Sequence, residues 1–103
     1  MVAEAPVVLL TPLARADLED IWRYTAANWS MQQADDYFRT LEAVFEGLAV
    51  GQKISTAVDV RAGYRKYVAG SHVIYFMPLP AGIEIVRILH HGMDVSRHLQ
   101  GVT

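Results

Sequence analysis

Apolar and polar positions follow one period in the first half of the chain and another in the second half. From Pro12 to about Asn28, and again from Ser30 to about Gly47, apolar residues recur every three or four positions with charged residues between them. This spacing puts the apolar residues on one side of an α-helix. After Gly63 the apolar residues come in short runs separated by Gly and Pro, which is typical of β-strands and turns. The pattern predicts two helices followed by a sheet.

Local signals mark where both helices begin. Thr11 can cap the first helix with its hydroxyl, and Pro12 has the backbone angle favoured at the first helical position. Ser30 and Gln33 form a capping-box pattern at the start of the second helix, and the link is so short that the two helices must form an antiparallel hairpin. The charged residues of the first helix are placed opposite its apolar stripe: Arg15, Asp17, Glu19, Asp20 and Arg23. The aromatic residues at helical spacing are expected to pack in the core: Trp22, Tyr37, Phe38 and Phe45.

Three strands are predicted in the second half, at Tyr64–Val68, His72–Met77 and Ile83–His90. Their connections are too short for a parallel crossover, so the strands form an antiparallel meander. Residues 6–10 form a further short strand, at the edge of the sheet or in second position, and residues 51–62 are predicted to form a loop. The order is β-α-α-β-β-β, an α+β fold in which a helical hairpin packs on one face of an antiparallel sheet.

The last predicted strand is apolar on both faces. Simple alternation places Ile83, Ile85 and Leu89 on one face, and Val86 and Ile88 on the other. A strand of this kind needs cover on both sides. Because two helices cover one face of the sheet, the second face is shielded either by the 51–62 loop and the C-terminal tail or by a partner protein.

Arg87 interrupts one apolar face of this strand. A guanidinium in such a position needs an anionic partner, because burying an unpaired charge is costly. Two partners stay open. An acid from another molecule would make Arg87 a binding residue, whereas a carboxylate within the chain would make it a structural one.

The composition limits the classes of function. A chain of 103 residues forms a single domain, here residues 1–103, and an apolar fraction of 52% is enough for a core. Without cysteine the chain has no disulfide, no thiolate nucleophile and no cysteine zinc site. No apolar run is long enough to cross a bilayer and the N-terminus has no secretory signal, so we expect a cytoplasmic protein without a membrane partner.

Charge is distributed unevenly along the chain. Up to Glu46, eight acidic residues oppose three basic ones, a net charge of −5, and from Gly47 onward six basic residues oppose three acidic ones, a net charge of +3. The basic half predicts contact with something anionic, either a nucleic acid or an acidic partner segment. Solvated acidic residues on the helices account for the charge of the first half.

Few residues have the setting of a catalytic or metal site. His90 and His91 are adjacent in a strand, so they point to opposite faces and do not ligate one metal ion together. No cofactor-binding motif is present. A histidine of this pair could act with Tyr64, Tyr67 or Tyr75 as an acid–base pair, which is the arrangement that a metal-free ribonuclease needs. A solvated, structural histidine is the alternative.

Several motifs occur in a fixed order from about Val8 to Leu99. The first helix contains DLEDIWRYTAANWS, the second begins with QADDYF, and the meander contains GYRKYVAGSHVIYF followed by GIEIVRILHHGMDVSRHL. Together with the element order, these stretches resemble the ParE toxins of the RelE/ParE superfamily. The resemblance is strongest in the meander and the tail, where the GYR, the GSHVIYF run, the IEIVRILH strand and the MD-x-x-RHL ending follow one another at the family's spacings.

The resemblance implies a toxin of a bacterial type II toxin–antitoxin system that inhibits DNA gyrase, without catalysis or a cofactor of its own. It also implies a hetero-oligomer with a ParD-like ribbon-helix-helix antitoxin, through which alone the complex binds DNA. Toxicity in the family is associated with the C-terminal end, here His90, His91, Met93, Asp94, Arg97 and His98. The residues expected to contact the antitoxin are Arg65, Lys66, Arg87, Tyr75, Trp22 and Trp29. We expect Arg87→Ala to weaken antitoxin binding more than it destabilises the chain.

Two other functions stay open. A ribosome-dependent mRNA interferase of the RelE type would need a dense cluster of Lys and Arg, and this chain has only two Lys, which favours inhibition of gyrase. The second alternative is an inactive homologue that acts as a binding module, because Gly92 and Met77 stand where relatives often carry basic residues.

Overall fold

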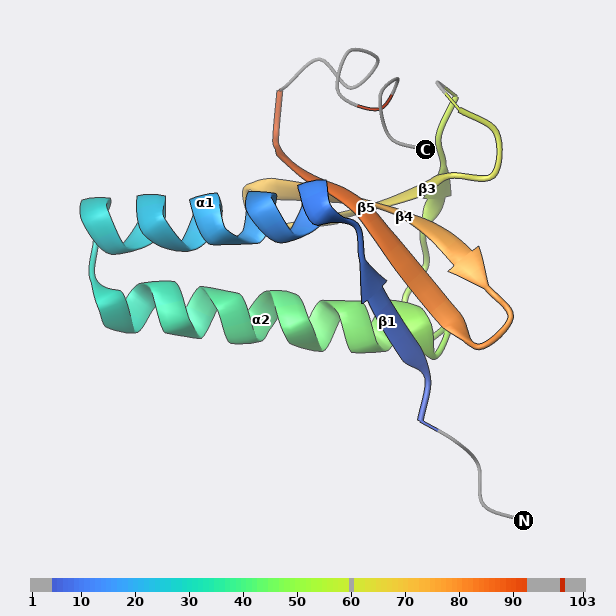
Figure 1. Cartoon of the computed structure of the whole chain (residues 1–103), viewed down its shortest axis with the longest axis horizontal. Helices are drawn as coiled ribbons and strands as arrows, with labels where there is room; N and C mark the ends of the chain where they lie inside the picture. Colours follow the sequence, from blue (N-terminus) through green and yellow to red (C-terminus); the bar gives the residue numbers. More distant parts are fainter. Residues whose placement is uncertain (1–4, 60, 93–98, 100–103) are drawn as a thin grey trace.

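The computed structural model of the chain describes residues 5–59, 61–92 and 99. Within these residues it has two helices and five strands (Figure 1). They are β1 (Val7–Leu10), α1 (Pro12–Asn28), α2 (Met31–Ala49), β2 (Thr56–Ala57), β3 (Arg65–Ala69), β4 (His72–Leu79) and β5 (Gly82–His90). The strands form one sheet in the order β1-β5-β4-β3-β2, in which β1 runs parallel to β5 and all other neighbours are antiparallel. The α+β class and the helical hairpin are confirmed, whereas β2 lies in a segment that was predicted to be loop throughout.

The caps expected from the sequence are present at both helix starts. Thr11 Oγ1 accepts a hydrogen bond from the Ala14 amide at 3.0 Å and donates one to the Val86 carbonyl at 2.8 Å. The same hydroxyl therefore starts α1 and ties it to β5. Ser30 Oγ accepts a hydrogen bond from the Gln33 amide at 3.0 Å at the start of α2.

Gly47 and Gly51 are the two glycines that the sequence predicts at the end of the second helix, and Gly51 is the one that ends α2, whereas Gly47 lies within it. Gly51 has a φ of 77°, and its amide donates to the Leu48 carbonyl at 3.2 Å, while the Gln52 amide donates to the Gly47 carbonyl at 2.9 Å. This pair of hydrogen bonds is the Schellman arrangement, which satisfies carbonyls at the end of a helix. It needs a residue in the left-handed region, and glycine adopts that conformation at little cost.

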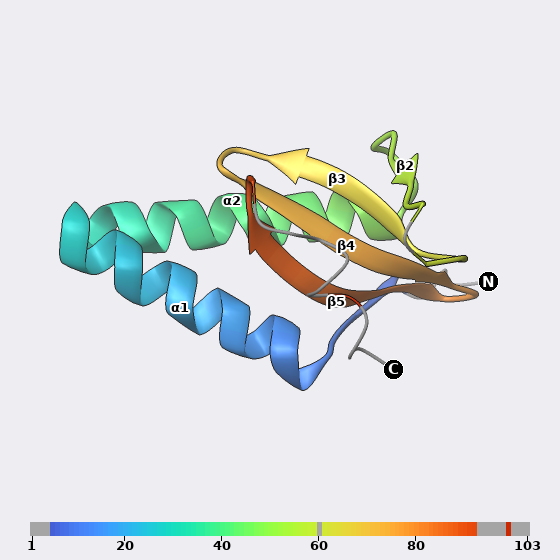
Figure 2. The ribbon, with the colours of Figure 1, turned by 90° about the horizontal axis from the view of Figure 1, so that it is seen from above.

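Both helices pack on one face of the sheet and bury the larger of two cores. Its buried members are Ala14, Leu18, Leu41, Phe45, Leu48, Ala69, Ile74, Phe76, Ile83, Ile85 and Ile88. The end of the hairpin that contains the α1–α2 connection extends past the turn between β3 and β4 (Figure 2). Part of each helix therefore has no strand beneath it.

A β-bulge in β5 reverses the faces expected for the last residues of this strand. The pairing of β4 with β5 shifts between Tyr75 and Phe76, which leaves Val86 as an extra residue on β5. As a result Ile88 packs with the helices, whereas Leu89 packs on the opposite face. The prediction was wrong for these two residues, because simple alternation does not allow for an inserted residue.

The second face of the sheet is covered by the chain itself. The core on this face consists of Val58, Tyr64, Val73, Tyr75, Val86, Leu89 and Leu99. Leu99 has no exposed surface, and Arg61 Nη1 donates to its carbonyl at 3.2 Å. Of the two kinds of cover that the sequence left open, the loop and the tail supply it. A partner protein is not required to bury this face.

Candidate functional site

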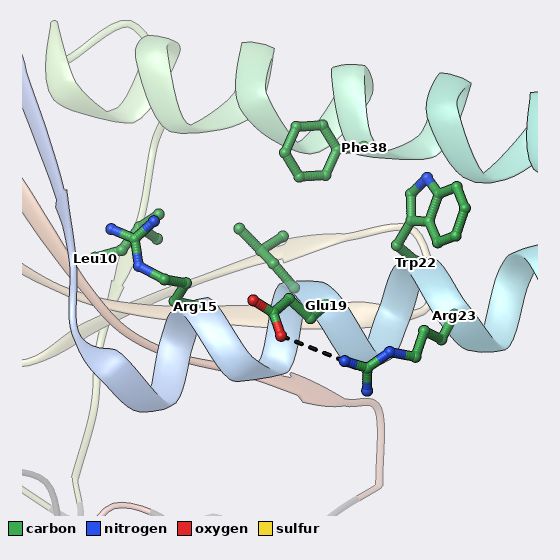
Figure 3. A pocket seen from close by; sticks show the side chains of 7 residues that line it. Leu10, Arg15, Glu19, Trp22, Arg23 and Phe38 are labelled. Carbon is green, nitrogen blue, oxygen red and sulfur yellow. Dashed lines mark hydrogen bonds and ion pairs between the residues drawn. The ribbon is translucent and has the colours of Figure 1, made fainter.

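The hairpin pocket is a depression of about 420 Å³ where α1 meets α2 and β1 (Figure 3). It is lined by Leu10, Arg15, Leu18, Glu19, Trp22, Arg23 and Phe38. Five of these side chains come from α1, because positions three and four apart fall on one side of a helix. Most of the exposed lining is apolar, and the charged groups lie among these apolar side chains. Such a pocket can hold an apolar side chain of a partner.

Arg15 is the cation of this pocket that is available to a partner. Arg23 already contacts Glu19 at 3.4 Å and Asp20 at 3.2 Å. Arg15 is exposed, and its side chain has no ion pair or hydrogen bond among the residues that the structure describes. Sequence reasoning missed it as a binding residue. The available signal was its position one turn before Glu19 and two turns before Trp22 on the same side of the helix.

Arg87 is paired within the chain. Its Nε and Nη2 donate to the two carboxylate oxygens of Asp17 at 2.8 Å and 2.9 Å, and the Ile88 amide donates to Asp17 Oδ2 at 2.9 Å. These side-chain hydrogen bonds raise the pKa of Arg87. The internal carboxylate, one of the two partners left open for Arg87, is therefore confirmed.

Asp17 does not lie on the solvated side of α1, where its sequence position had placed it. Its side chain is 13% exposed, and that of Arg87 is 14% exposed. β1 pairs with β5 only as far as Ile85, so the following part of that edge has no strand beside it. Asp17 accepts a hydrogen bond from the Ile88 amide at this edge, in place of the carbonyl of a neighbouring strand. This explains why a carboxylate faces the sheet.

The two other predicted cations lie on β3 and are not part of the hairpin pocket. Arg65 donates from Nη2 to the Ser55 carbonyl at 2.7 Å and from Nε to the Ser55 hydroxyl. Lys66 is exposed and lies opposite Thr56 of β2. Since β4 separates β3 from β5, the structure does not gather Arg65, Lys66 and Arg87 into one cluster.

Of the three aromatic residues predicted to contact a partner, two are accessible. Trp29 is 71% exposed at the connection between the helices. Trp22 lines the hairpin pocket, and its Nε1 donates to Asp35 Oδ1 at 2.9 Å. Tyr75 is only 5% exposed and belongs to the second core. The prediction for Tyr75 was wrong, because the chain covers the face of the sheet on which it lies.

His90 and His91 are exposed at the end of β5. The ring of His90 lies edge-on to that of His72, with 5.6 Å between the centroids, and His72 Nδ1 is 2.8 Å from the Tyr37 hydroxyl. The fold therefore pairs His72 with Tyr37, a combination that the sequence did not suggest because the two residues are 35 positions apart. The other predicted toxicity residues, Met93, Asp94, Arg97 and His98, lie outside the described residues.

Burial lowers the pKa of His72, and repulsion from His90 lowers it further, while the nearby Asp17 carboxylate acts in the opposite direction. Burial also raises the pKa of the Tyr37 hydroxyl. Both groups are therefore neutral at pH 7, and the hydrogen bond between them involves no charged partner.

Acidification is expected to destabilise the chain through His72. Its folded pKa lies below the ordinary value of 6.5, so in that interval the unfolded chain binds more protons and the free energy of unfolding falls as the pH falls. Urea unfolding at about pH 7.5 and about pH 5 should show a smaller loss for His72→Gln than for the unaltered chain. His91→Gln, at an exposed position, is the control and should leave the loss unchanged. An equal loss in all three proteins would assign the pH dependence to other groups.

No three His, Asp or Glu side chains gather into a group that could hold a metal ion within the part of the chain that the structure describes. Nor is any helix in that part long and apolar enough to cross a membrane.

Comparisons with known proteins find similar sequences and a similar fold. Residues 8–95 match the family described as ParE toxin of type II toxin-antitoxin system, parDE. The chain is 43% identical over 93 residues to Toxin ParE1 of Mycobacterium tuberculosis, covering 88% of this chain and 95% of that relative. It is 40% identical over 94 residues to Toxin ParE1 of Caulobacter vibrioides, covering 87% and 94%.

One similar solved structure is described as "Chromosomal ParDE TA system from P. aeruginosa". A chain in it superposes with a TM-score of 0.71 and 18% identity, covering 84% of this chain and 96% of that one. At this level of identity the likeness concerns the fold.

Proposed function

Because the chain belongs to the family of ParE toxins of type II toxin–antitoxin systems, we propose that it inhibits DNA gyrase and is neutralised by a ParD-like antitoxin. The hairpin pocket is the observation that carries the antitoxin part of this proposal. An apolar floor beside an unpaired cation suits an amphipathic, acidic segment of a partner.

The fit depends on two features of the pocket. Trp22 and Phe38 offer large apolar surfaces of the kind that anchors a partner's side chain. Arg15 can then meet a carboxylate on the same partner segment with a charge-assisted hydrogen bond. Lys66, exposed on β3, is a second cation that a longer antitoxin segment could reach, in agreement with its expected role.

The arrangement of charges supports inhibition of gyrase over cleavage of RNA. A ribonuclease of the RelE type would hold phosphate with several cations around its acid–base groups. The His72–Tyr37 pair instead lies in a groove that is lined by the exposed carboxylates of Asp20 and Asp36. Carboxylates in that position repel a phosphate backbone.

A supercoiling assay with purified DNA gyrase tests this function. We expect the purified chain to abolish supercoiling and the ParD-like antitoxin to restore it, while messages on translating ribosomes stay intact. Cleaved messages with unaffected gyrase would instead establish an mRNA interferase. If the chain neither inhibits supercoiling nor cleaves messages but still binds the antitoxin tightly, it is an inactive homologue.

The antitoxin surface is tested in the same assay by charge reversal. Arg15→Glu should weaken antitoxin binding by roughly ten- to a hundredfold, because it turns an attraction into a repulsion. Arg39→Glu is the matched control, since Arg39 is 71% exposed on α2 and does not line the pocket. Supercoiling should be inhibited equally by both variants in the absence of antitoxin. Equal antitoxin affinity for both would move the binding surface away from the hairpin pocket.

A further inference from the structure

A second depression, the overhang groove, is formed where α1 and α2 meet the sheet near the turn between β3 and β4. At this end of the molecule the hairpin extends past the sheet (Figures 1 and 2). The volume of the groove is about 1100 Å³, and its lining comes from α1, α2, the first residues of β4 and the last residues of β5. We propose that the overhang groove binds a cationic peptide segment that carries an apolar anchor. This inference does not depend on gyrase or on the antitoxin.

The overhang groove and the hairpin pocket lie on opposite sides of α1. Asp17, Asp20 and Tyr24 line the groove, whereas Arg15 and Trp22 line the pocket. At 100° per residue the two sets point in nearly opposite directions around the helix. A partner held in one depression therefore leaves the other free.

The charge of the groove determines the sign of its ligand. Three carboxylates line it, those of Asp17, Asp20 and Asp36, and among the residues that the structure describes no Lys or Arg side chain does. Asp17 is committed to Arg87. Among the described residues, Asp20 and Asp36 form ion pairs with arginines on their own helices alone, and their side chains are 74% and 60% exposed. Because exposed pairs of this kind are weak, both carboxylates can turn to a cation on a ligand.

Two exposed aromatic side chains add apolar surface at the rim. Tyr24 is 67% exposed and Trp29 is 71% exposed, and both line the groove. Tyrosine and tryptophan are the residues that most often dominate binding energy at interfaces, and their faces attract Lys and Arg. An apolar side chain of the ligand can lie against them while its neighbouring cations reach Asp20 and Asp36.

The same features exclude the competing ligands. A nucleic acid would bring phosphates to the two exposed carboxylates, those of Asp20 and Asp36, and the acidic segment that fits the hairpin pocket would be repelled for the same reason. The floor contains the neutral His72–Tyr37 pair and adds no positive charge at pH 7. A cationic peptide is therefore the ligand that satisfies both the carboxylates and the aromatic rim.

The test is a calorimetric titration of the full chain with two short synthetic peptides. One peptide consists of Lys and Leu, and the other has Glu in place of each Lys. We expect the Lys–Leu peptide to bind with a micromolar dissociation constant and the Glu–Leu peptide not to bind. Trp29→Ala and Asp36→Lys should each weaken binding by roughly tenfold or more. No binding of the Lys–Leu peptide, or equal binding of both peptides, would overturn the proposal.

Two control variants separate the groove from general attraction to an acidic surface. Glu46→Lys makes the same change of charge on α2 at an exposed position outside the groove, and it should leave the affinity within about twofold. If it weakens binding as much as Asp36→Lys does, the attraction is not specific to the groove and the proposal is wrong. Arg15→Glu, in the hairpin pocket, should not weaken binding of the Lys–Leu peptide, and a loss as large as that of Trp29→Ala would also overturn the assignment.

Discussion

Replacing Asp17 with alanine is expected to lower the free energy of unfolding by about 3–5 kcal/mol. The substitution removes the carboxylate that accepts hydrogen bonds from Arg87 Nε and Nη2 and from the Ile88 amide. Both groups lie where water reaches them poorly, so neither is well compensated by solvent. Asp17→Asn should cost less, because its amide oxygen can still accept one of these hydrogen bonds.

Urea unfolding followed by circular dichroism measures this loss. Asp20→Ala is the matched control, because Asp20 lies on the same helix with a side chain that is 74% exposed. Its expected change is within about 0.5 kcal/mol. A loss below about 1 kcal/mol for Asp17→Ala would contradict the structural role of the Asp17–Arg87 pair.

Arg87→Ala separates the two roles that the sequence left open for this residue. The sequence predicts that the substitution weakens antitoxin binding more than it destabilises the chain. The pairing with Asp17 adds a loss of stability, because a buried carboxylate would be left with only the Ile88 amide. The affinity of Arg87→Ala for the antitoxin, measured under conditions in which the variant is fully folded, decides between a binding role and a structural role. An unchanged affinity would make Arg87 purely structural.

Replacing Leu99 with alanine is the second change with a large expected effect, about 2–5 kcal/mol of lost stability. Leu99 has no exposed surface and packs in the second core with side chains of β4 and β5. Removing its side chain leaves a cavity in the second core, which is away from α1 and α2. The loss should therefore lie well above that of an exposed leucine or valine.

The measurement is again urea unfolding, with Val68→Ala as the control because Val68 is 57% exposed on β3. That control should change stability by less than about 1 kcal/mol. Unfolding of Leu99→Ala at the same urea concentration as the unaltered chain would show that the tail does not hold the second core. Supercoiling assays on the folded variant would then show whether anchoring of the tail also matters for the toxicity expected of residues 90–99.

The two depressions divide the hairpin into surfaces of different charge. One has an exposed arginine, Arg15, beside apolar side chains, and the other has three carboxylates beside exposed aromatic rings. They suit partners of opposite charge. Because they occupy different sides of α1, binding at one does not require the other to be empty.

Local signals in the sequence define both helices and four of the five strands, because these signals act over a few residues, whereas β2 was missed. Thr11 and Ser30 cap helices through hydrogen bonds to amides three positions later. The short links of the meander allow only antiparallel neighbours, and the motifs from Val8 to Leu99 resemble the family without reference to the fold. Each of these inferences needed only neighbouring residues or their order.

The tertiary structure alone decided which distant residues meet. Asp17 and Arg87 are 70 positions apart, and on a helix drawn from the sequence Asp17 belonged to the solvated side. It became buried because β1 stops pairing at Ile85 and leaves the edge of β5 to the helix. The bulge at Val86 exchanged the faces of the residues that follow, since one inserted residue changes the parity of a strand. The packing of α1 on the edge of β5 and the alternation of side chains along β5 both depend on how the whole sheet is paired. The spacing of apolar residues in the sequence does not contain this information.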